Sequence, residues 1–461
     1  MKNKIKDNLS LKYNNTHTPY IAQIILTNNQ SRILYLLIIL LILLLFTNLF
    51  FKNFIFIDEF TFVITIFFIV LMNMPIIHRF VPIIKQFNPE NVYIKTEIAT
   101  SFDLENLPNY SILAPLYKEK ELILKIIYHL SNIKYPKNKL QILLLLEIDD
   151  IETKAMLPDN LPENFSIIEV PLGFPRGKPR ALNYGLKEVN GEFLTIYDAE
   201  DIPDPYQLLK AISIFDKYGD EVWAIQAKLR FNNPSSSWLS LFFYCEYRFW
   251  YDIYLPYLFH NKYPIPLGGT SNHLRTEKIK TIIGWDSYNV TEDADLSLRI
   301  YYEGGKVVLM DSITHERAPT SIANWIRQRS RWVKGLIQTM LVHTRKKQNS
   351  ITIRYFLYCI SGTLLPFYIL ILFCLSCCSL SSKYAYFIFM IQIFAFLFNI
   401  ILTTIIFFSE LVKTKIVNIW AFLFPGVLTY WIIYLIASIR AAYQLFTCPF
   451  YWDKTNHNKN S

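Results

Sequence analysis

Two acidic side chains, Asp198 and Glu200, stand two positions apart directly after the apolar run 192–197. Carboxylate oxygens suit hard cations such as Mg²⁺ and Mn²⁺, and a cation held there can bridge the phosphates of a nucleotide. The alternative is an acidic turn, because Asp and Pro both favour turns and Ile-Pro-Asp-Pro follows at 202–205. Three acids within 198–201, directly after an expected buried strand, favour the metal site.

The run Gln-Arg-Ser-Arg-Trp at 328–332 combines donors with a flat ring. If the segment 321–342 is helical, spacings of three and four residues place Gln328, Arg331 and Trp332 on one face. Arginine offers a planar fork of donors for phosphate oxygens, and an indole offers an apolar surface on which a sugar ring can lie. The alternative is a basic helix that enters a membrane with Arg and Trp as interfacial anchors.

Two further motifs lie between these sets. Asp293 ends the tripeptide Thr-Glu-Asp just before an expected helix at 294–302, so it either caps that helix or acts as a general base. The paired glycines in Leu-Gly-Gly-Thr-Ser-Asn at 267–272 either let the backbone approach a ligand closely or form a tight turn.

The region from 109 to 304 must position these residues. Short apolar or β-branched runs alternate there with helical patterns. The strands are expected at 111–116, 141–146, 166–170, 192–197 and 222–226, and the helices at 119–130, 178–189 and 205–215. This alternation predicts a parallel or mixed sheet with helices on both faces. In such sheets ligands bind outside the carboxyl ends of the strands, where the motifs stand.

The ends of the first strands carry further candidates. Tyr117 can stack on a nucleobase and Glu119 can bind the base or ribose, although both residue types are ordinary in loops. The acids at 147–150 can hold a base edge or a ribose hydroxyl, and the alternative is a helix N-cap at Asp149 or its neighbour. Lys178 brings a cation to an expected helix start, which suits a diphosphate.

Long apolar runs flank this region. The runs Ile33–Phe51, Phe60–Ile77, Tyr355–Leu380 and Tyr384–Phe408 are each long enough to cross about 30 Å of hydrocarbon. A fifth run, Ile419–Ile439, has basic residues at both ends and Pro-Gly inside it, so it is either a further span or a re-entrant or interfacial segment.

Charge sets the expected orientation and excludes some functions. Basic residues precede the first run and follow the second, whereas Asp58 and Glu59 lie between them, so the N-terminus and the large middle region are expected in the cytoplasm of a multi-pass plasma-membrane protein. The net charge of +9 forms no basic stripe interleaved with aromatics, which argues against nucleic-acid binding. The six cysteines form neither a zinc spacing nor a secreted disulfide pattern.

The ordered series Asp-Ala-Glu at 198–200, Thr-Glu-Asp at 291–293 and Gln-Arg-Ser-Arg-Trp at 328–332 resembles the D, DxD, TED, QxxRW series of family 2 glycosyltransferases. The resemblance is closest to the membrane-integrated, processive cellulose-synthase-like branch, and with the flanking runs it covers most of residues 30–455. It implies an α/β GT-A domain, a Rossmann-like mixed sheet, in the cytosol between transmembrane α-helices. The tail 449–457 resembles the cytosolic gating loop of cellulose synthases.

The resemblance and the apolar runs together divide the chain into eight parts. They are an N-terminal cytosolic tail at 1–30, two transmembrane helices at 31–78, a linker at 79–108, the GT-A domain at 109–318, an interfacial helix with QxxRW at 319–350, two transmembrane helices at 351–410, a further membrane segment at 411–447 and a C-terminal tail at 448–461.

The resemblance also implies a role for each candidate residue. The donor side comprises Tyr117, Glu119, Lys178, Asp198, Gln328 and Arg331, with either Glu147 or Asp149 at the second strand. The metal ligands are Asp198 and Glu200, where Glu200 departs from the usual Asp and lengthens the arm. The catalytic residues are Asp293 as base and Glu292 beside the acceptor, and the acceptor side comprises Trp332 and Gly269.

The implied activity is inverting transfer of a hexose from a UDP-sugar, of the UDP-glucose kind, to a growing β-linked polysaccharide, with Mg²⁺ or Mn²⁺ as cofactor. Two alternatives stay open. One is a single transfer to a lipid, either a polyprenyl phosphate or a glycolipid, and the other is a non-catalytic partner subunit of an export complex. The expected partners are therefore the UDP-sugar donor, a glycan or lipid acceptor, the bilayer and export or accessory subunits.

Overall fold

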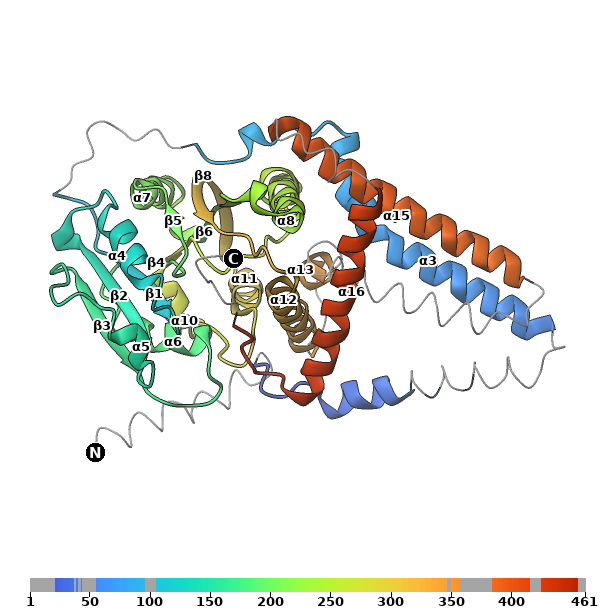
Figure 1. The fold of residues 1–461 in the computed structure, drawn as a ribbon, viewed down its shortest axis with the longest axis horizontal. Coiled ribbons are helices and arrows are strands. Elements are labelled where there is room, and N and C mark those ends of the chain that lie inside the picture. Colours follow the sequence, from blue (N-terminus) through green and yellow to red (C-terminus); the bar gives the residue numbers. More distant parts are fainter. Residues whose placement is uncertain are drawn as a thin grey trace.

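The computed structural model describes residues 21–36, 39, 43, 55–95, 105–345, 350–356, 384–414 and 424–454. An α/β part lies at one end of the molecule, and the long helices α3 (Ile55–Ile84) and α15 (Ala385–Thr414) lie together at the other (Figure 1). The helix α16 (Phe424–Thr447) runs between these two parts.

The α/β part is built on one sheet of eight strands in the order β3-β2-β1-β4-β7-β6-β8-β5. The strands are β1 Tyr110–Leu116, β2 Leu140–Glu147, β3 Phe165–Val170, β4 Phe193–Ile196, β5 Ile202–Pro203, β6 Val222–Phe231, β7 Asn272–Arg275 and β8 Lys306–Glu316. The strands β1 to β4 run parallel to one another, and β7 runs antiparallel to both β4 and β6. The predicted mixed sheet is confirmed, and its strands β5, β7 and β8 were not predicted.

The helices of the α/β part cover both faces of the sheet, as predicted. They are α4 Ile123–Ser131, α5 Ile151–Lys154, α6 Lys178–Leu186, α7 Gln207–Tyr218, α8 Trp238–Phe249, α9 Leu255–His260, α10 Thr276–Thr281, α11 Glu292–Tyr302, α12 Ile322–His343 and α13 Ser350–Tyr355, with a π-helical turn at Trp250–Tyr254. The helix expected at 119–130 begins only at Ile123, because the chain first turns over the end of β2, where Glu119 N–H donates to the Thr153 hydroxyl.

Alternate side chains of the central strands pack into two separate hydrophobic cores, one on each face of the sheet. Leu113 and Leu143 belong to the core that contains Leu182 of α6, whereas Ile112 and Leu144 belong to the core that α4 and α7 complete. Successive strand side chains point to opposite faces, so a strand with helices on both sides must be apolar throughout. This burial is why the strands that carry the candidate residues read as unbroken apolar runs.

The predicted helix at 321–342 is confirmed as α12. It begins after Ser321, whose hydroxyl accepts a hydrogen bond from Asn324 N–H as an N-cap. The buried Trp325 packs edge-on against Tyr430 of α16, with ring centroids 5.1 Å apart. One helical turn further, the Ser330 hydroxyl donates to the Ala437 carbonyl at 2.9 Å, so α12 and α16 lie in close contact along their length.

Two helices among the described residues, Tyr386–Val412 and Pro425–Thr447, are long and apolar enough to cross a membrane. The predicted run Phe60–Ile77 lies within α3, which packs against α15. In the described part of the fifth run, Pro425 and Gly426 both lie within the helix α16, and residues 419–423 lie outside the described residues. The predicted runs 33–51 and 355–380 lie largely outside the described residues.

Candidate active site

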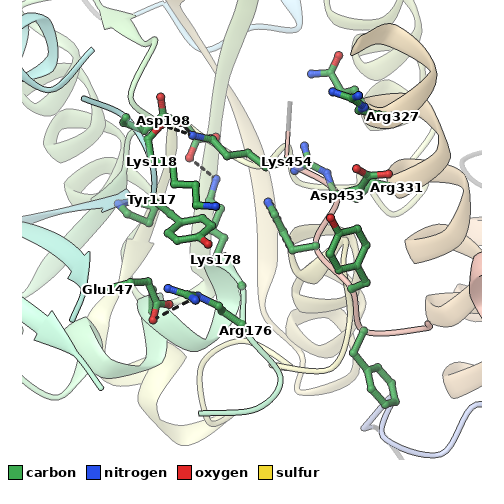
Figure 2. A pocket seen from close by; sticks show the side chains of 18 of the residues that line it. Tyr117, Lys118, Glu147, Arg176, Lys178, Asp198, Arg327, Arg331, Asp453 and Lys454 are labelled. Atoms are coloured by element: carbon green, nitrogen blue, oxygen red, sulfur yellow. Dashed lines mark hydrogen bonds and ion pairs between the residues drawn. The ribbon is translucent and has the colours of Figure 1, made fainter. Parts of the chain in front are cut away.

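Two adjoining cavities open where the predicted motifs meet. The larger cavity, of about 980 Å³, lies at the carboxyl ends of β1, β2 and β4, as expected for a parallel sheet (Figure 2). The smaller cavity, of about 290 Å³, lies between the sheet and the helices α8, α11 and α12. Both cavities are lined by Lys178, Asp198, Glu200, Gln328, Arg331 and Trp452.

The wall formed by the ends of β1 and β2 carries an aromatic ring under a guanidinium. Arg176 lies 4.3 Å from the centre of the Tyr117 ring (Figure 2). It also forms a bidentate ion pair with Asp149, which lowers the pKa of that carboxyl. Glu147 lines the larger cavity and pairs with Arg180 at 3.0 Å, yet burial raises its pKa more than Arg180 and Arg176 lower it. Asp149 is held by Arg176 outside the cavity wall.

The predicted N-cap among the acids 147–150 is Asp150. Its carboxylate accepts hydrogen bonds from Thr153 N–H, which caps α5, and from Lys118 N–H in the loop after β1 at 2.5 Å. The predicted N-cap at Asp149 or its neighbour is thus confirmed at the neighbour, because the Asp149 side chain pairs with Arg176 instead.

Lys178 stands at the first turn of α6 and bridges two motifs. Its ammonium donates to Asp198 Oδ1 at 2.5 Å and to the Gly269 carbonyl at 2.7 Å. Burial alone would lower the pKa of Lys178, but the carboxylates of Asp198 and Glu292 outweigh it and the pKa is raised. The ammonium is therefore held in its charged form at a helix start, where both its charge and the helix dipole favour an anion.

The acids that follow β4 face one another and a further acid from β8. Burial raises the pKa values of Asp201 and Glu316 well above the ordinary range, and the nearby carboxylates of Asp198 and Glu200 raise them further. Asp201 Oδ1 and Glu316 Oε1 are buried without a hydrogen-bond partner among the described residues. This uncompensated set of oxygens fits the chemistry of a hard divalent cation.

The described residues hold no group of three His, Cys, Asp or Glu side chains placed to bind a metal ion alone. Asp201 also serves another purpose, because its Oδ2 accepts hydrogen bonds from Asp198 N–H at 2.6 Å and from the Thr270 hydroxyl. A cation at Asp198 and Glu200 would therefore need oxygens from a bound phosphate to complete its ligand set.

The tripeptide Thr-Glu-Asp at the start of α11 lines the smaller cavity. Thr291 is the N-cap residue, so the prediction that Asp293 might cap the helix is wrong, and Asp293 instead lies in the first turn and lines the smaller cavity. Burial, followed by the neighbouring Asp293, raises the pKa of Glu292 to about 8. Burial also raises the pKa of Asp293, against the opposing effect of Lys178 and Arg331.

Helix α12 packs directly on this turn. A Cβ atom at Gly335 would lie 2.5 Å from the Thr291 hydroxyl oxygen, so only glycine allows this approach. Asn289 Nδ2 donates to the Thr339 hydroxyl at 2.9 Å, and Val290 N–H donates to Gln338 Oε1 at 3.1 Å. The loop that carries the acids is thus tied to the helix that carries Gln-Arg-Ser-Arg-Trp.

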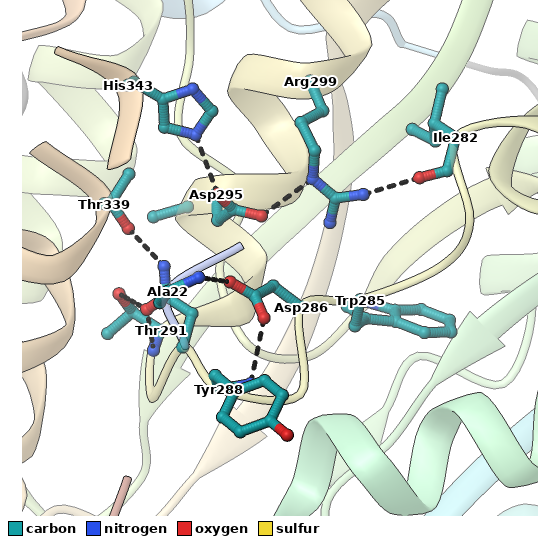
Figure 3. A network of polar contacts seen from close by, with 12 residues as sticks. Ala22, Ile282, Trp285, Asp286, Tyr288, Thr291, Asp295, Arg299, Thr339 and His343 are labelled. Carbon is teal, nitrogen blue, oxygen red and sulfur yellow. Dashed lines mark hydrogen bonds and ion pairs between the residues drawn. The ribbon is translucent and has the colours of Figure 1, made fainter. Parts of the chain in front are cut away.

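A buried ionic network also joins α11 to α12 (Figure 3). Asp295 of α11 accepts hydrogen bonds from His343 Nε2 and from Arg299 Nε, both at 2.8 Å. Burial alone would raise the pKa of Asp295, but Arg299 and His343 outweigh it and the pKa is lowered. Nearby, Asp286 accepts a hydrogen bond from Ala22 N–H at 2.6 Å, which brings a segment from the start of the chain onto the same network (Figure 3).

Gln328, Arg331 and Trp332 share one face of α12, as predicted. Gln328, Arg331 and Trp332 all line the smaller cavity, and Gln328 Oε1 is a buried acceptor without a partner among the described residues. Trp332 stacks on Tyr247 with centroids 6.1 Å apart and planes inclined by 27°. Arg329 packs against this pair of rings. It forms a bidentate ion pair with Glu246 at 2.7 and 2.8 Å, and its guanidinium lies 4.9 Å from the centre of the Trp332 ring.

The C-terminal segment Pro449–Lys454 lines the larger cavity, although none of its residues is among the predicted site residues. Trp452 lies under Arg331 at 4.3 Å, and Lys334 Nζ donates to the Tyr451 carbonyl at 2.9 Å. Lys454 forms an ion pair with Glu119 at 2.8 Å. The aromatic run Phe-Tyr-Trp after the last apolar segment is the signal that could have indicated this segment, whereas the sequence around Arg176 and Glu316 offered none.

Residues 108–335 match the family model described as "Glycosyltransferase like family 2". The "Probable glycosyltransferase YdaM" of Bacillus subtilis is 27% identical over 252 residues, which are 50% of this chain and 56% of that protein. The "Beta-monoglucosyldiacylglycerol synthase" of Trichormus variabilis is 24% identical over 246 residues, 51% of this chain and 50% of that protein. The chain thus spans about half the length of these curated relatives.

One solved structure shares the fold over most of the chain. It is the mannosyltransferase PcManGT from Pyrobaculum calidifontis in complex with GDP-Man and Mn²⁺, with a TM-score of 0.53 at 17% identity, covering 83% of this chain and 99% of that one. The order of strands, the acids at the carboxyl edge of the sheet and the family match agree with one another. Residues 108–335 therefore form a glycosyltransferase family 2 domain with a GT-A-like α/β fold.

Proposed function

We propose that the protein transfers a hexose from a nucleotide sugar, of the UDP-sugar kind, to a lipid acceptor at the membrane surface, with inversion at the anomeric carbon. The observation that carries the proposal is the meeting of the two cavities. Asp293 faces the smaller cavity, while Lys178 and Asp198 line the shared wall. A donor in the larger cavity would present its sugar to an acceptor in the smaller one.

The nucleotide end of the donor is assigned to the wall at Tyr117, Glu119 and Glu147. The Tyr117 ring offers a stacking surface, and the Arg176 guanidinium above it offers donors for ribose or phosphate. Lys178 would hold the diphosphate at the start of α6. Gln328 would donate to or accept from a sugar hydroxyl, because its buried Oε1 has no partner among the described residues.

Asp198 and Glu200 are the proposed ligands of Mg²⁺ or Mn²⁺, with phosphate oxygens of the donor as the remaining ligands. The uncompensated oxygens of Asp201 and Glu316 beside them favour this assignment. The cation, when bound, offsets negative charge on the diphosphate. PcManGT carries Mn²⁺ with its GDP-Man, which agrees with this choice of metal.

Asp293 is the proposed general base. It would take the proton of an acceptor hydroxyl as the oxygen of that hydroxyl attacks the anomeric carbon and the nucleoside diphosphate leaves. Lys178 and Arg331 oppose the rise that burial causes in the pKa of Asp293, whereas Glu292, with a pKa of about 8, holds its proton at neutral pH. Neighbouring carboxyl groups with separated pKa values suit two different roles, so Glu292 would donate a hydrogen bond to the acceptor.

The membrane setting is proposed from the exposed apolar faces of the long helices. On α3 the exposed side chains recur every three or four residues, at Val63, Phe67, Val70, Met74 and Ile77. Exposed apolar stripes of this length are typical of lipid-facing helices. We therefore keep the predicted division of the chain into a cytoplasmic catalytic domain between membrane helices of a multi-pass plasma-membrane protein.

A lipid acceptor is preferred to a growing glycan because of the size and setting of the smaller cavity. Its volume of about 290 Å³ lies at the lower end of small-molecule sites, which suits a headgroup, and its wall includes α3 and α16. The β-monoglucosyldiacylglycerol synthase among the relatives is named for a lipid product. The polysaccharide product stays a second candidate, since Trp332 stacked on Tyr247 offers an aromatic floor for a sugar ring.

The test is release of nucleoside diphosphate by the full chain in nanodiscs, with a panel of UDP-sugars and GDP-mannose, with Mg²⁺, Mn²⁺ or EDTA. We expect metal-dependent release for one donor, lower by about 10²- to 10⁴-fold in Asp293→Asn. The matched control is Asp159→Asn at an exposed position. Donor binding without release by any donor, in the presence of lipids and glycans, would favour the non-catalytic partner subunit instead.

A further inference from the structure

Arg79 of α3 lines the smaller cavity and has no acidic partner among the described residues. Its guanidinium carbon lies 5.8 Å from the centre of the Tyr254 ring, and its Nε is buried without a hydrogen-bond partner. A buried guanidinium nitrogen without a partner costs free energy unless a ligand supplies an acceptor.

Two of the other cations of this cavity form ion pairs, Lys178 with Asp198 and Arg329 with Glu246. Arg331 lies against the Trp452 ring on the wall that both cavities share, beside the proposed diphosphate site. Arg79 is therefore the cation of the smaller cavity that, among the described residues, forms no ion pair and lies away from the larger cavity.

An arginine just after an apolar helical run is commonly a membrane-interface anchor whose charged group reaches outward. Lys85, at the same end of α3, is exposed and fits that description. Arg79 differs, because its side chain lines a cavity that also contains Asp293. It is only partly exposed, and its Nε is shielded from solvent.

The catalytic acids gather at a different part of the same cavity wall. A Cβ atom at Gly269 would lie 3.6 Å from both Asp293 Oδ2 and Lys178 Nζ, which places these groups together. Arg79 instead lies beside Tyr254 of the π-helical turn. A phosphate beside the Asp293 carboxylate would be repelled, whereas a hydroxyl there can lose its proton to Asp293.

We propose that the acceptor is an anionic phospholipid with a hydroxyl-bearing headgroup, whose phosphodiester binds Arg79 while its hydroxyl reaches Asp293. This inference rests on the proposed transferase function. In the step, the headgroup oxygen forms a bond to the anomeric carbon of the donor sugar, and its proton passes to the Asp293 carboxylate. The bond between the anomeric carbon and the diphosphate oxygen breaks, and the nucleoside diphosphate leaves with the electron pair.

The test compares lipids that separate the two chemical groups. Phosphatidylglycerol has both a phosphodiester and a free hydroxyl, diacylglycerol has only the hydroxyl, and polyprenyl phosphate offers phosphate oxygen as the nucleophile. Diacylglycerol is supplied in phosphatidylserine vesicles, so that the surface stays anionic in every arm. Transfer of radiolabelled sugar to lipid is measured with the donor that supports nucleoside diphosphate release.

We expect preferred transfer to phosphatidylglycerol. Arg79→Gln should raise the KM for this lipid by about 10- to 100-fold, the range for losing a charged hydrogen bond, without changing the KM of the donor. Transfer to diacylglycerol should be the same in Arg79→Gln and wild type. Arg79→Lys, which keeps the charge, should recover most of the loss, and Lys85→Gln should behave as wild type.

Equal or better transfer to diacylglycerol or polyprenyl phosphate would overturn the proposal, and so would an equal effect of Arg79→Gln on all lipids. Nucleoside diphosphate release that leads to a glycan and to no lipid would also overturn it while leaving the transferase function intact. Absence of release with every donor would instead count against the proposed function itself. Melting temperatures of the variants separate a binding effect from loss of the fold.

Discussion

The ammonium of Lys454 lies 2.8 Å from the carboxylate of Glu119, so a residue near the end of the chain is joined to the loop that follows the first strand of the sheet (Figure 2). Lys454 also donates to the Lys118 carbonyl at 2.6 Å. The segment Pro449–Lys454 therefore reaches from α12 and α16 to the proposed nucleotide wall. Residues that are far apart in sequence build one cavity.

Trp452→Leu should weaken donor binding. The change removes the indole under Arg331 and the contact with Gly177, where a Cβ atom would lie 3.3 Å from the indole. A cation–π contact contributes about 0.5 to 2 kcal/mol, so the Kd for nucleoside diphosphate should rise by about 3- to 30-fold in calorimetry. Trp238→Leu, at a partly exposed position outside both cavities, is the control. An unchanged Kd would remove the segment from the donor site.

Glu292→Gln should change how stability depends on pH. The pKa of Glu292 rises from about 4.5 in the unfolded chain to about 8 in the fold, so the folded state binds more protons between these values. The wild type therefore loses stability as pH rises from about 4.5 to 8, and the glutamine variant lacks this loss. Thermal melting at a series of pH values measures it, with the exposed Glu163→Gln as control. If the melting temperatures of Glu292→Gln and wild type changed with pH in the same way, the expectation would be contradicted.

Asp295→Asn should separate the two helices that carry the catalytic motifs. The variant leaves Arg299 and His343 buried without their charged partner, which costs about 3 to 5 kcal/mol for a buried pair. Chemical denaturation measures the loss, and Asp159→Asn provides the exposed comparison. At a temperature where the variant stays folded, the sugar-transfer rate should also fall, because Thr291–Asp293 rest on the same contact. Full stability together with full activity would be inconsistent with this role.

Arg329→Met should disturb the position of the Trp332 ring, on which an acceptor sugar could lie. Arg329 holds Glu246 and lies against the Trp332 ring, so the variant frees the ring and leaves Glu246 without its partner. Glu246 is 31% exposed, so we expect a smaller cost than for a fully buried pair, about 2 to 3 kcal/mol. The KM for acceptor should rise more than the KM for donor in steady-state kinetics. Arg248→Met, which breaks a pair with Asp252 outside the cavities, is the control, and an equal effect on both KM values would argue against the assignment.

The parallel half of the sheet was predictable because its strands are local apolar runs that hold helices on both faces. The strand β7 was missed, since Asn272–Arg275 is short and carries an amide, a histidine and an arginine. These polar groups are tolerated only because the fold supplies partners from distant segments, such as the Tyr110 hydroxyl at 2.6 Å from His273 Nδ1. β8 was missed although its apolar half, Val307–Met310, is fully buried.

The sequence by itself determined which residues can do chemistry and on which elements they lie. The acids after β4, the tripeptide before α11 and the single face of α12 all follow from spacing within one local element. Only the tertiary structure decided which charges pair with one another. The pairs of Lys178 with Asp198 and of Lys454 with Glu119 depend on distances between segments far apart in the chain, and so does the lack of an ion pair at Arg79 among the described residues. Burial, which raises the pKa values of Glu292 and Asp293, is likewise a property of the packed fold.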